Sequence, residues 1–313
     1  MDILLNGLRA AGEPTRLRLL ALCAHGELTV SELTQILGQS QPRVSRHLKL
    51  LCEAGLLDRF REGTWAFYRL AERGACAALA RTMVDLIPEN DATLTRDLER
   101  LEAAKQTRAE AAAAYFRANA ARWSEIRSLH VADENVEAAL MDVLGEQAID
   151  EFLDVGTGTG RILELLAPRV GRGVGIDLSR EMLAIARSTL ENANLRHCQV
   201  RLGDMYHLPV PAASFDVITF HQVLHYADDP SAAIAEAARV LKPGGRVAVV
   251  DFEPHDLEYL REQHAHRRLG FSEQEVAAWY AAAGLELNAS RRLAGDPLTV
   301  GIWLARQPGS GPQ

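Results

Sequence analysis

The sequence predicts two domains of different fold class, an α+β domain followed by an α/β domain with a doubly wound sheet. Its 313 residues are 48% hydrophobic and 24% charged, which is enough for two globular cores. Apolar residues in the range 1–90 follow the spacing of short helices and then of one hairpin, whereas strands and helices alternate over residues 146–306. Such alternation is typical of a parallel sheet with helices on both faces.

The first domain begins with three helices. Pro14 stands where the first turn of a helix tolerates proline, and apolar residues follow it as far as Gly26. A capping box over Thr29–Glu32 begins a second helix, which ends at Gly38. A third helix is expected over Gln41–Glu53. The last two helices are joined by a short turn that contains a glycine, and they therefore form a helix-turn-helix.

A hairpin follows these helices. Its strands are expected at Leu57–Arg61 and Trp65–Leu70, around a turn at Glu62–Gly63. A hairpin directly after a helix-turn-helix forms a wing, which lies along the DNA backbone while the second helix enters the major groove. The fold expected for residues 1–90 is therefore a winged helix-turn-helix.

The helix over residues 41–53 has two different faces. Helical spacing places Val44, Leu48 and Leu51 on its buried side. A charged opposite face on a short helix can simply meet solvent, but here the adjoining hairpin also carries arginines, and this favours contact with bases and phosphates. The expected DNA-binding residues are Gln41, Arg43, Ser45, Arg46, Lys49, Arg59 and Arg61.

The formal net charge of -8 is unusual for a nucleic-acid binder until it is divided along the chain. Residues 1–90 hold 11 basic and 10 acidic side chains, and residues 40–73 hold seven basic and four acidic ones. A local basic face suffices for DNA, because phosphate neutralisation acts over short distances under salt screening.

The second domain is expected to hold five strands and a closing hairpin. The hairpin, Leu285–Leu293 and Leu298–Arg306, is placed antiparallel at the sheet edge. Residues 91–145 are expected to be a helical linker or dimer segment with a long helix over Asp91–Arg127, and residues 307–313 a disordered tail. The five earlier strands are expected at Glu151–Val155, Val174–Leu178, Gln199–Leu202, Phe215–Phe220 and Arg246–Phe252.

A glycine-rich loop follows the first of these strands. In Gly156-Thr157-Gly158-Thr159-Gly160 the absence of Cβ atoms lets backbone approach a ligand. The spacing differs from the Gly-x-Gly-x-x-Gly of dinucleotide folds, which makes a nicotinamide cofactor less favoured. Asp177 ends the second strand 21 residues after Gly156, where a carboxylate can accept hydrogen bonds from ribose hydroxyls. Together these residues predict a nucleoside ligand.

Two further motifs extend the pattern. Gly203-Asp204-Met205 follows the third strand, where Asp204 can accept from an adenine amino group, and Leu241-Lys242-Pro243-Gly244-Gly245 precedes the fifth. With the glycine loop and Asp177, this series resembles the class I S-adenosylmethionine-dependent methyltransferases over residues 148–306, which implies a Rossmann-like fold and S-adenosylmethionine or S-adenosylhomocysteine as ligand.

The resemblance also implies roles for single residues. The residue matching Asp154 lies by the methionine amino group, the one matching Asp177 binds the ribose, and those matching Asp204 and Met205 flank the adenine. The residues expected to bind the cofactor are Asp154, Gly156, Gly158, Gly160, Asp177, Leu178, Asp204, Met205 and His221.

The evidence for catalysis is less specific. Methyl transfer needs an in-line nucleophile and, where that nucleophile carries a proton, a base. His221, His225 and Tyr226 follow the fourth strand and are the catalytic candidates, although histidines there can equally line an inert pocket.

Two more clusters can cap the cofactor or bind a substrate. The first is Tyr115-Phe116 with Trp123 and Arg127, and the second is His264-Ala265-His266-Arg267-Arg268. The simpler interpretations are helix packing for the first and a solvent-exposed charged face for the second.

No metal, disulfide framework or membrane span is expected. The cysteines, Cys23, Cys52, Cys76 and Cys198, are scattered without metal-ligand spacing. No apolar stretch approaches the ~20 residues of a membrane helix, and no secretion signal is evident, so a cytoplasmic protein is predicted.

Residues 10–73 resemble the ArsR-type regulators. The resemblance rests on Glu13-Pro14-Thr15-Arg16-Leu17-Arg18-Leu19-Leu20, on the run from Leu37 to Leu48, and on Gly55-Leu56-Leu57. Arsenic-sensing members carry paired cysteines in the helix before the recognition helix, and Glu32–Leu37 contains none. The resemblance implies a double-stranded DNA operator and a homodimer, with an effector other than a metal.

The two resemblances together suggest a transcriptional regulator whose second domain binds S-adenosylmethionine or S-adenosylhomocysteine as effector. The arrangement resembles bacterial regulators of methionine-cycle genes that respond to S-adenosylhomocysteine. The alternative is an active methyltransferase of a small molecule with an autoregulatory DNA-binding module.

Overall fold

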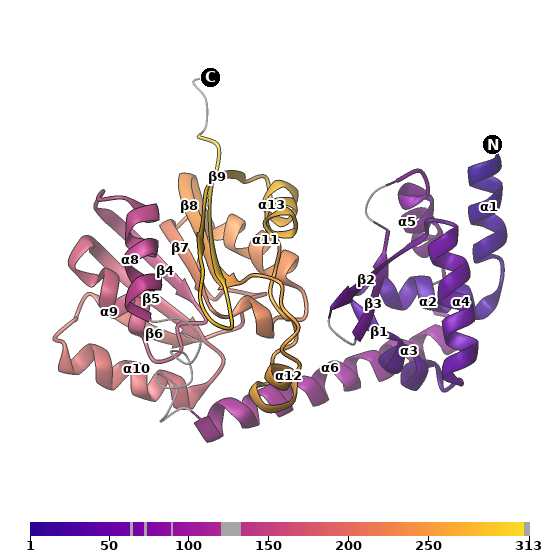
Figure 1. Ribbon diagram of the computed structural model, residues 1–313, viewed down its shortest axis with the longest axis horizontal. Helices are drawn as coiled ribbons and strands as arrows, with labels where there is room; N and C mark the ends of the chain where they lie inside the picture. Colours follow the sequence, from indigo (N-terminus) through magenta and orange to yellow (C-terminus); the bar gives the residue numbers. More distant parts are fainter. Residues whose placement is uncertain (63–64, 72–73, 89, 120–132, 310–313) are drawn as a thin grey trace. The chain divides into compact units, whose positions relative to one another are not determined.

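The computed structural model describes residues 1–62, 65–71, 74–88, 90–119 and 133–309 (Figure 1). These residues belong to two compact units, one over residues 1–110 and the other over residues 111–313. The division falls within one helix, α6 (Ala92–Asn119), which contributes residues to both.

The first unit contains the predicted helix-turn-helix and wing. Thr29 and Glu32 form the expected capping box, and Gly38 ends its helix in the left-handed conformation, with φ of 62°. Helices α1 and α5 and the two-residue strand β1 had not been predicted from the sequence. The elements are α1 (Asp2–Ala11), α2 (Pro14–Cys23), β1 (Leu28–Thr29), α3 (Val30–Leu37), α4 (Gln41–Glu53), β2 (Leu57–Glu62), β3 (Trp65–Leu70) and α5 (Ala77–Asp85).

The core of this unit is aliphatic and closed by α6. The three strands pair in the order β1-β3-β2, all antiparallel. Leu48 and Leu51 of α4 are fully buried with Leu33 of α3, as the apolar spacing predicts. From α6, Leu101 joins the same core and Asp97 is 1% exposed. The first half of the linker helix is therefore part of the unit that contains the helix-turn-helix.

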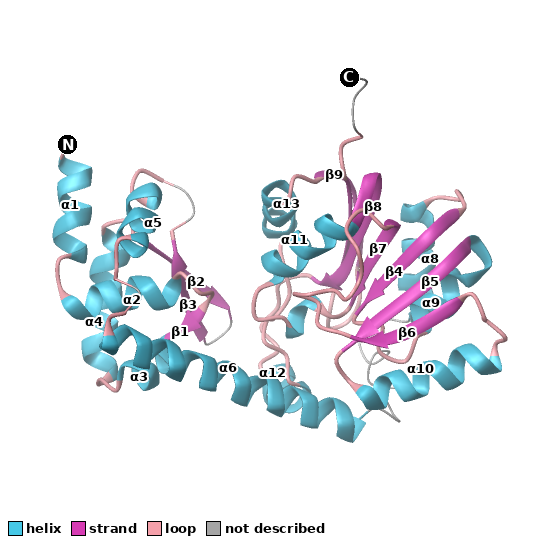
Figure 2. Cartoon of the chain, turned by 180° about the vertical axis from the view of Figure 1, so that it is seen from behind, coloured by secondary structure: helices cyan, strands magenta, loops and turns pink. Residues whose placement is uncertain are grey.

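The second unit is an α/β domain with a seven-stranded sheet (Figure 2). The strand order is β6-β5-β4-β7-β8-β10-β9, where β6, β5, β4, β7 and β8 are parallel and β10 pairs antiparallel with both β8 and β9. The strands are β4 (Ile149–Val155), β5 (Val170–Asp177), β6 (Cys198–Leu202), β7 (Phe215–His221), β8 (Leu241–Phe252), β9 (Glu286–Leu293) and β10 (Val300–Arg306).

Helices cover both faces of this sheet, so the doubly wound fold with an antiparallel edge hairpin is confirmed. One apolar cluster joins α8, α9 and α10 to one face, and another joins α11 and α13 to the opposite face. Phe152 and Leu153, consecutive in β4, belong to different clusters, as alternation along a strand requires. The helices are α8 (Asp133–Leu144), α9 (Arg161–Leu166), α10 (Arg180–Asn192), α11 (Pro230–Val240), α12 (Tyr259–His264) and α13 (Glu273–Ala282), with the 3-10 turns η2 (Ala167–Arg169) and η3 (Leu224–Tyr226).

Several boundaries differ from the predictions. Strand β8 begins at Leu241 rather than Arg246, because Lys242-Pro243-Gly244-Gly245 continues the strand, with a register shift against β7. The long helix is described as far as Asn119, so Trp123 and Arg127 lie outside the described residues, as do the last four residues of the tail.

Candidate functional site: an adenosyl-ligand edge and a DNA-reading face

The expected ligand residues of the second unit follow the carboxyl ends of neighbouring parallel strands. Strand β4 lies between β5 and β7, so the strand order reverses there. Ligands of doubly wound sheets bind at this kind of switch point, outside the carboxyl ends of the strands.

Asp177 ends β5 with its carboxylate fixed by backbone. Its Oδ2 accepts a hydrogen bond from the Gly158 N–H and its Oδ1 one from the Ser179 N–H, each at 2.8 Å. Burial raises the pKa of Asp177, and these backbone donors oppose that shift. A carboxylate offers about four acceptor positions, so Asp177 keeps acceptor capacity beyond these backbone contacts.

The glycine loop has the backbone conformation that its residues predict. Gly156, Gly158 and Gly160 have φ of 71°, 52° and 82°, in the left-handed region. A Cβ on Gly156 would lie 2.3 Å from Cγ2 of Val223, in the segment after β7. Any larger residue is excluded both by conformation and by space. The loop therefore presents backbone to this edge of the sheet, as a cradle for a small ligand requires.

The predicted base-contacting residues surround the next two strand ends. Leu178, directly after Asp177, is 63% exposed and offers an apolar surface for a nucleobase. Asp204 follows β6, where its Oδ1 accepts from the Tyr206 N–H at 3.0 Å, and Met205 packs on the apolar cluster of this face. The sequence predicts that Asp177 contacts the sugar and Asp204 the base of an adenosyl group, and this assignment stays a prediction.

Asp154 and His221 lie at the carboxyl ends of the neighbouring strands β4 and β7. Asp154 is 1% exposed, and its Oδ1 accepts from the Thr219 hydroxyl of β7 at 2.7 Å. His221, the last residue of β7, is 8% exposed. Asp154 stays a candidate for contact with the methionine amino group, and His221 stays a candidate for cofactor binding and catalysis.

The sequence patterns had missed one partner of the catalytic candidates. His225 Nδ1 lies 2.7 Å from Oδ1 of Asp251, and the His225 N–H also donates to Asp251 Oδ2 at 3.2 Å. Asp251 is fully buried in β8. The pair is 26 residues apart, and only the pairing of β8 beside β7 brings it together. A buried carboxylate fixes which ring nitrogen of the histidine carries a proton.

Aromatic rings enclose this pair. The ring of His225 stacks on that of His266, with centroids 4.1 Å apart, and contacts Tyr226 at the same distance. Burial raises the pKa of Tyr226 well above its usual value, so its hydroxyl stays protonated at neutral pH. Burial also lowers the pKa of nearby His255 to about 4. Burial therefore favours the neutral forms of Tyr226 and His255.

The His264–Arg268 cluster is not a solvent-exposed charged face, and that interpretation was wrong. His266, Arg267 and Arg268 are 8%, 9% and 2% exposed. Arg267 pairs with Asp228 at 3.2 Å and Arg268 with Glu275 at 3.2 Å. The arginine heads are buried because carboxylates neutralise them, which a count of local charges does not reveal.

The first unit presents the predicted DNA-reading face. Val44, Leu48 and Leu51 are buried, and of the predicted residues Gln41, Arg43, Arg46, Lys49, Arg59 and Arg61 are exposed, with Ser45 half-buried. Arg69 of the wing instead makes contacts within the first unit. Its guanidinium pairs with the Glu27 carboxylate at 3.3 Å, and its Cζ lies 5.6 Å from the centre of the Phe60 ring. Arg69 supports the hairpin.

The described part of the chain shows neither a metal-binding cluster nor a membrane-spanning helix. There, no group of three His, Cys, Asp or Glu side chains can hold a metal ion, and the four cysteines are free thiols. Within the same residues no helix is both long enough and apolar enough to cross a membrane.

Comparison with protein families agrees with both halves of the chain. Residues 13–59 match the family of bacterial regulatory proteins called arsR, and residues 153–249 match the methyltransferase domain. The chain thus carries an arsR-family helix-turn-helix domain and a methyltransferase domain.

Individual relatives match the methyltransferase half. An uncharacterized methyltransferase of Schizosaccharomyces pombe is 41% identical over 106 residues, 31% of this chain and 38% of that protein. The ubiquinone biosynthesis O-methyltransferase of Acinetobacter baumannii is 28% identical over 211 residues, 61% of this chain and 89% of that protein. The chain spans only 34% to 44% of the length of the first three curated relatives.

A solved structure agrees with the fold. A chain from a methyltransferase activator complex of Haloferax volcanii aligns with a TM-score of 0.53 at 23% identity, covering 62% of this chain and 97% of that one. This likeness concerns the fold alone.

Proposed function

We propose that the protein is a DNA-binding transcriptional regulator whose methyltransferase-type domain binds S-adenosylmethionine or S-adenosylhomocysteine as effector. The observation that carries the proposal is the presence on one chain of an exposed basic recognition helix and of a glycine loop whose N–H fixes Asp177. The missing cysteine pair in α3 supports an effector other than a metal.

The test of this proposal is the coupling between ligand and DNA. Saturating S-adenosylhomocysteine is expected to change the affinity for duplex DNA by at least ~5-fold, and DNA to change the ligand affinity by the same factor, because linkage is reciprocal. Calorimetric titration of the full chain with each adenosyl ligand, with and without a duplex selected from a randomised library, measures both factors. Equal DNA affinity with and without both ligands would sink the regulator proposal.

For the DNA-reading face, Arg43→Ala and Arg46→Ala are each expected to weaken duplex binding by ~1 to 3 kcal/mol if the arginine contacts a base. A loss that shrinks as salt rises would instead indicate a phosphate contact. Fluorescence anisotropy at two salt concentrations measures the effect, with Arg96→Ala, an exposed arginine of α6, as matched control. Wild-type affinity in both variants would contradict the prediction that α4 binds in the major groove.

We further propose a homodimer formed through α1. Four apolar side chains of this helix, Ile3, Leu4, Leu5 and Leu8, are 40% to 61% exposed. A second copy is the occupant we favour, because one recognition helix reads half of a two-fold operator. Ile3→Glu with Leu8→Glu is expected to give a monomer in equilibrium sedimentation, while Leu202→Glu, equally exposed in the other unit, leaves the mass unchanged. A dimer in both would place the interface elsewhere.

The alternative function is methyl transfer to a small molecule, and the His225–Asp251 pair favours it. When bound, S-adenosylmethionine would supply the electrophilic methyl group. A histidine oriented by a carboxylate can act as a general base that takes a proton from the methyl acceptor. Conversion of S-adenosylmethionine by wild type but not by His225→Ala, together with DNA affinity independent of ligand, would make this the function.

A further inference from the structure

The last turns of α6 pack on the methyltransferase unit through two aromatic side chains. The hydroxyl of Tyr115 lies 2.8 Å from Nδ1 of His264. The ring of Phe116 meets that of Tyr226 edge-on, with 4.8 Å between centroids. All four residues belong to the unit of residues 111–313.

Tyr226 ends the segment that covers the glycine loop. Val223 fills the space beside Gly156, and only two residues separate it from Tyr226. The same segment contains Gln222 at φ of 51°, a conformation that side-chain-bearing residues rarely adopt. Such strain is frequent in segments that change conformation with a ligand. The segment that ends at Tyr226 therefore packs directly on the glycine loop.

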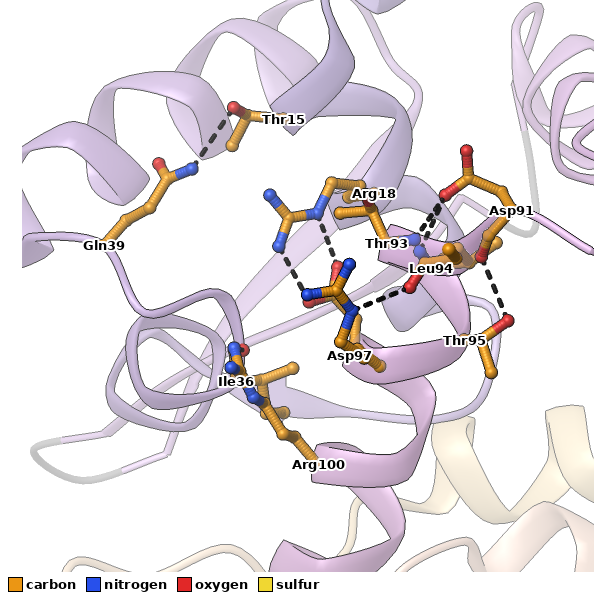
Figure 3. A network of polar contacts seen from close by, with 12 residues as sticks. Thr15, Arg18, Ile36, Gln39, Asp91, Thr93, Leu94, Thr95, Asp97 and Arg100 are labelled. Carbon is orange, nitrogen blue, oxygen red and sulfur yellow. Dashed lines mark hydrogen bonds and ion pairs between the residues drawn. The ribbon is translucent and has the colours of Figure 1, made fainter.

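The other half of α6 is attached to the DNA-reading unit. Arg100 donates from Nη1 to the carbonyl oxygen of Ile36 at 2.9 Å, and Asp97 forms a bidentate pair with Arg18 (Figure 3). Ile36 lies in the last turn of α3, the helix directly before the recognition helix. One continuous helix thus contacts α3 near one end and Tyr226 near the other.

We propose that the Phe116–Tyr226 contact is the point at which the adenosyl ligand regulates the DNA-reading unit; the proposal rests on the effector function above. Ligand binding changes the conformation of residues 222–226, and this alters how Phe116 packs on Tyr226. The resulting shift of α6 changes its contacts with α3. A ligand shifts the equilibrium between two packings of Phe116 on Tyr226 only if it binds the protein with different affinity in each. Removing the ring contact removes this difference in affinity.

The test compares three variants of the full chain. Phe116→Ala deletes the ring, Tyr115→Phe removes only the hydroxyl that meets His264, and Arg117→Ala alters the exposed neighbouring residue as control. For each, S-adenosylhomocysteine affinity is measured by calorimetry, and duplex affinity with and without that ligand by anisotropy. We expect Phe116→Ala to keep the S-adenosylhomocysteine affinity without DNA and the duplex affinity without ligand within ~2-fold of wild type, while the coupling falls from at least ~5-fold to below ~2-fold. Tyr115→Phe should reduce the coupling partly, and Arg117→Ala should keep it.

The outcomes separate this inference from the regulator proposal. Wild type without coupling would overturn both. Full coupling in wild type and in Phe116→Ala would overturn the inference alone. Loss of S-adenosylhomocysteine binding in Phe116→Ala would also overturn it, because the ring would then be part of the ligand site. If Phe116→Ala does not fold, full coupling in Tyr115→Phe together with unchanged hydrogen exchange of residues 114–119 on ligand binding overturns it.

Discussion

Asp177→Ala is expected to remove nearly all measurable affinity for S-adenosylhomocysteine. A ribose offers two hydroxyls to this carboxylate, and each charge-assisted hydrogen bond contributes ~1.5 to 3 kcal/mol. The loss is therefore at least ~100-fold in the dissociation constant, from about 3 kcal/mol. Calorimetric titration of the full chain measures it.

The alanine variant also changes the loop, so a second variant is needed. Without the carboxylate, the N–H groups of Gly158 and Ser179 lose their acceptor, and the glycine loop can shift. Asp177→Asn keeps one acceptor oxygen and is expected to lose less affinity than the alanine variant. Asp150→Ala, an exposed acid in β4, is the matched control. Wild-type affinity in Asp177→Ala would show that the ligand binds elsewhere.

Local signals in the sequence predicted the ligand edge well. A tight loop with positive φ requires glycines, and an acid at the end of the next strand is part of the same local pattern. Both features depend on only a few neighbouring residues, so the sequence shows them directly. The loop from Gly156 to Gly160 and the end of β5 at Asp177 lie where their patterns placed them. The identity and role of the ligand-binding residues stay predictions.

Contacts that depend on tertiary packing could not be predicted in the same way. Asp251 stands in an apolar strand, and nothing near it in the sequence indicates that it faces His225. The burial of Arg268 depends on Glu275, in the following helix. Helix α1 was missed although its apolar residues gather on one side; its buried positions are the small residues Gly7 and Ala11, whereas Ile3 remains exposed.

Arg18→Met is expected to have the largest effect on the stability of the DNA-reading unit. Arg18 donates from Nε and Nη2 to the two carboxylate oxygens of Asp97, at 2.5 and 2.7 Å, and Asp97 is 1% exposed (Figure 3). Removing one partner of a buried pair costs ~3 to 5 kcal/mol, because the other charge is left without compensation. The Arg18 side chain is 20% exposed, so we expect roughly 3 kcal/mol, near the lower end of this range.

The double variant Arg18→Met with Asp97→Leu distinguishes the lost charge from lost packing. Without the buried carboxylate the apolar pair should recover most of the stability, since buried ion pairs are often no more stable than well-packed apolar replacements. Urea unfolding of the full chain, with hydrogen exchange of α2 and α6 to assign the transition, measures both variants, and Arg96→Met is the control for an exposed arginine of α6. If the double variant is no more stable than Arg18→Met, the unpaired charge is not the cause. The pair would then hold α6 against α2 by shape, and charge would contribute little to the docking of this helix.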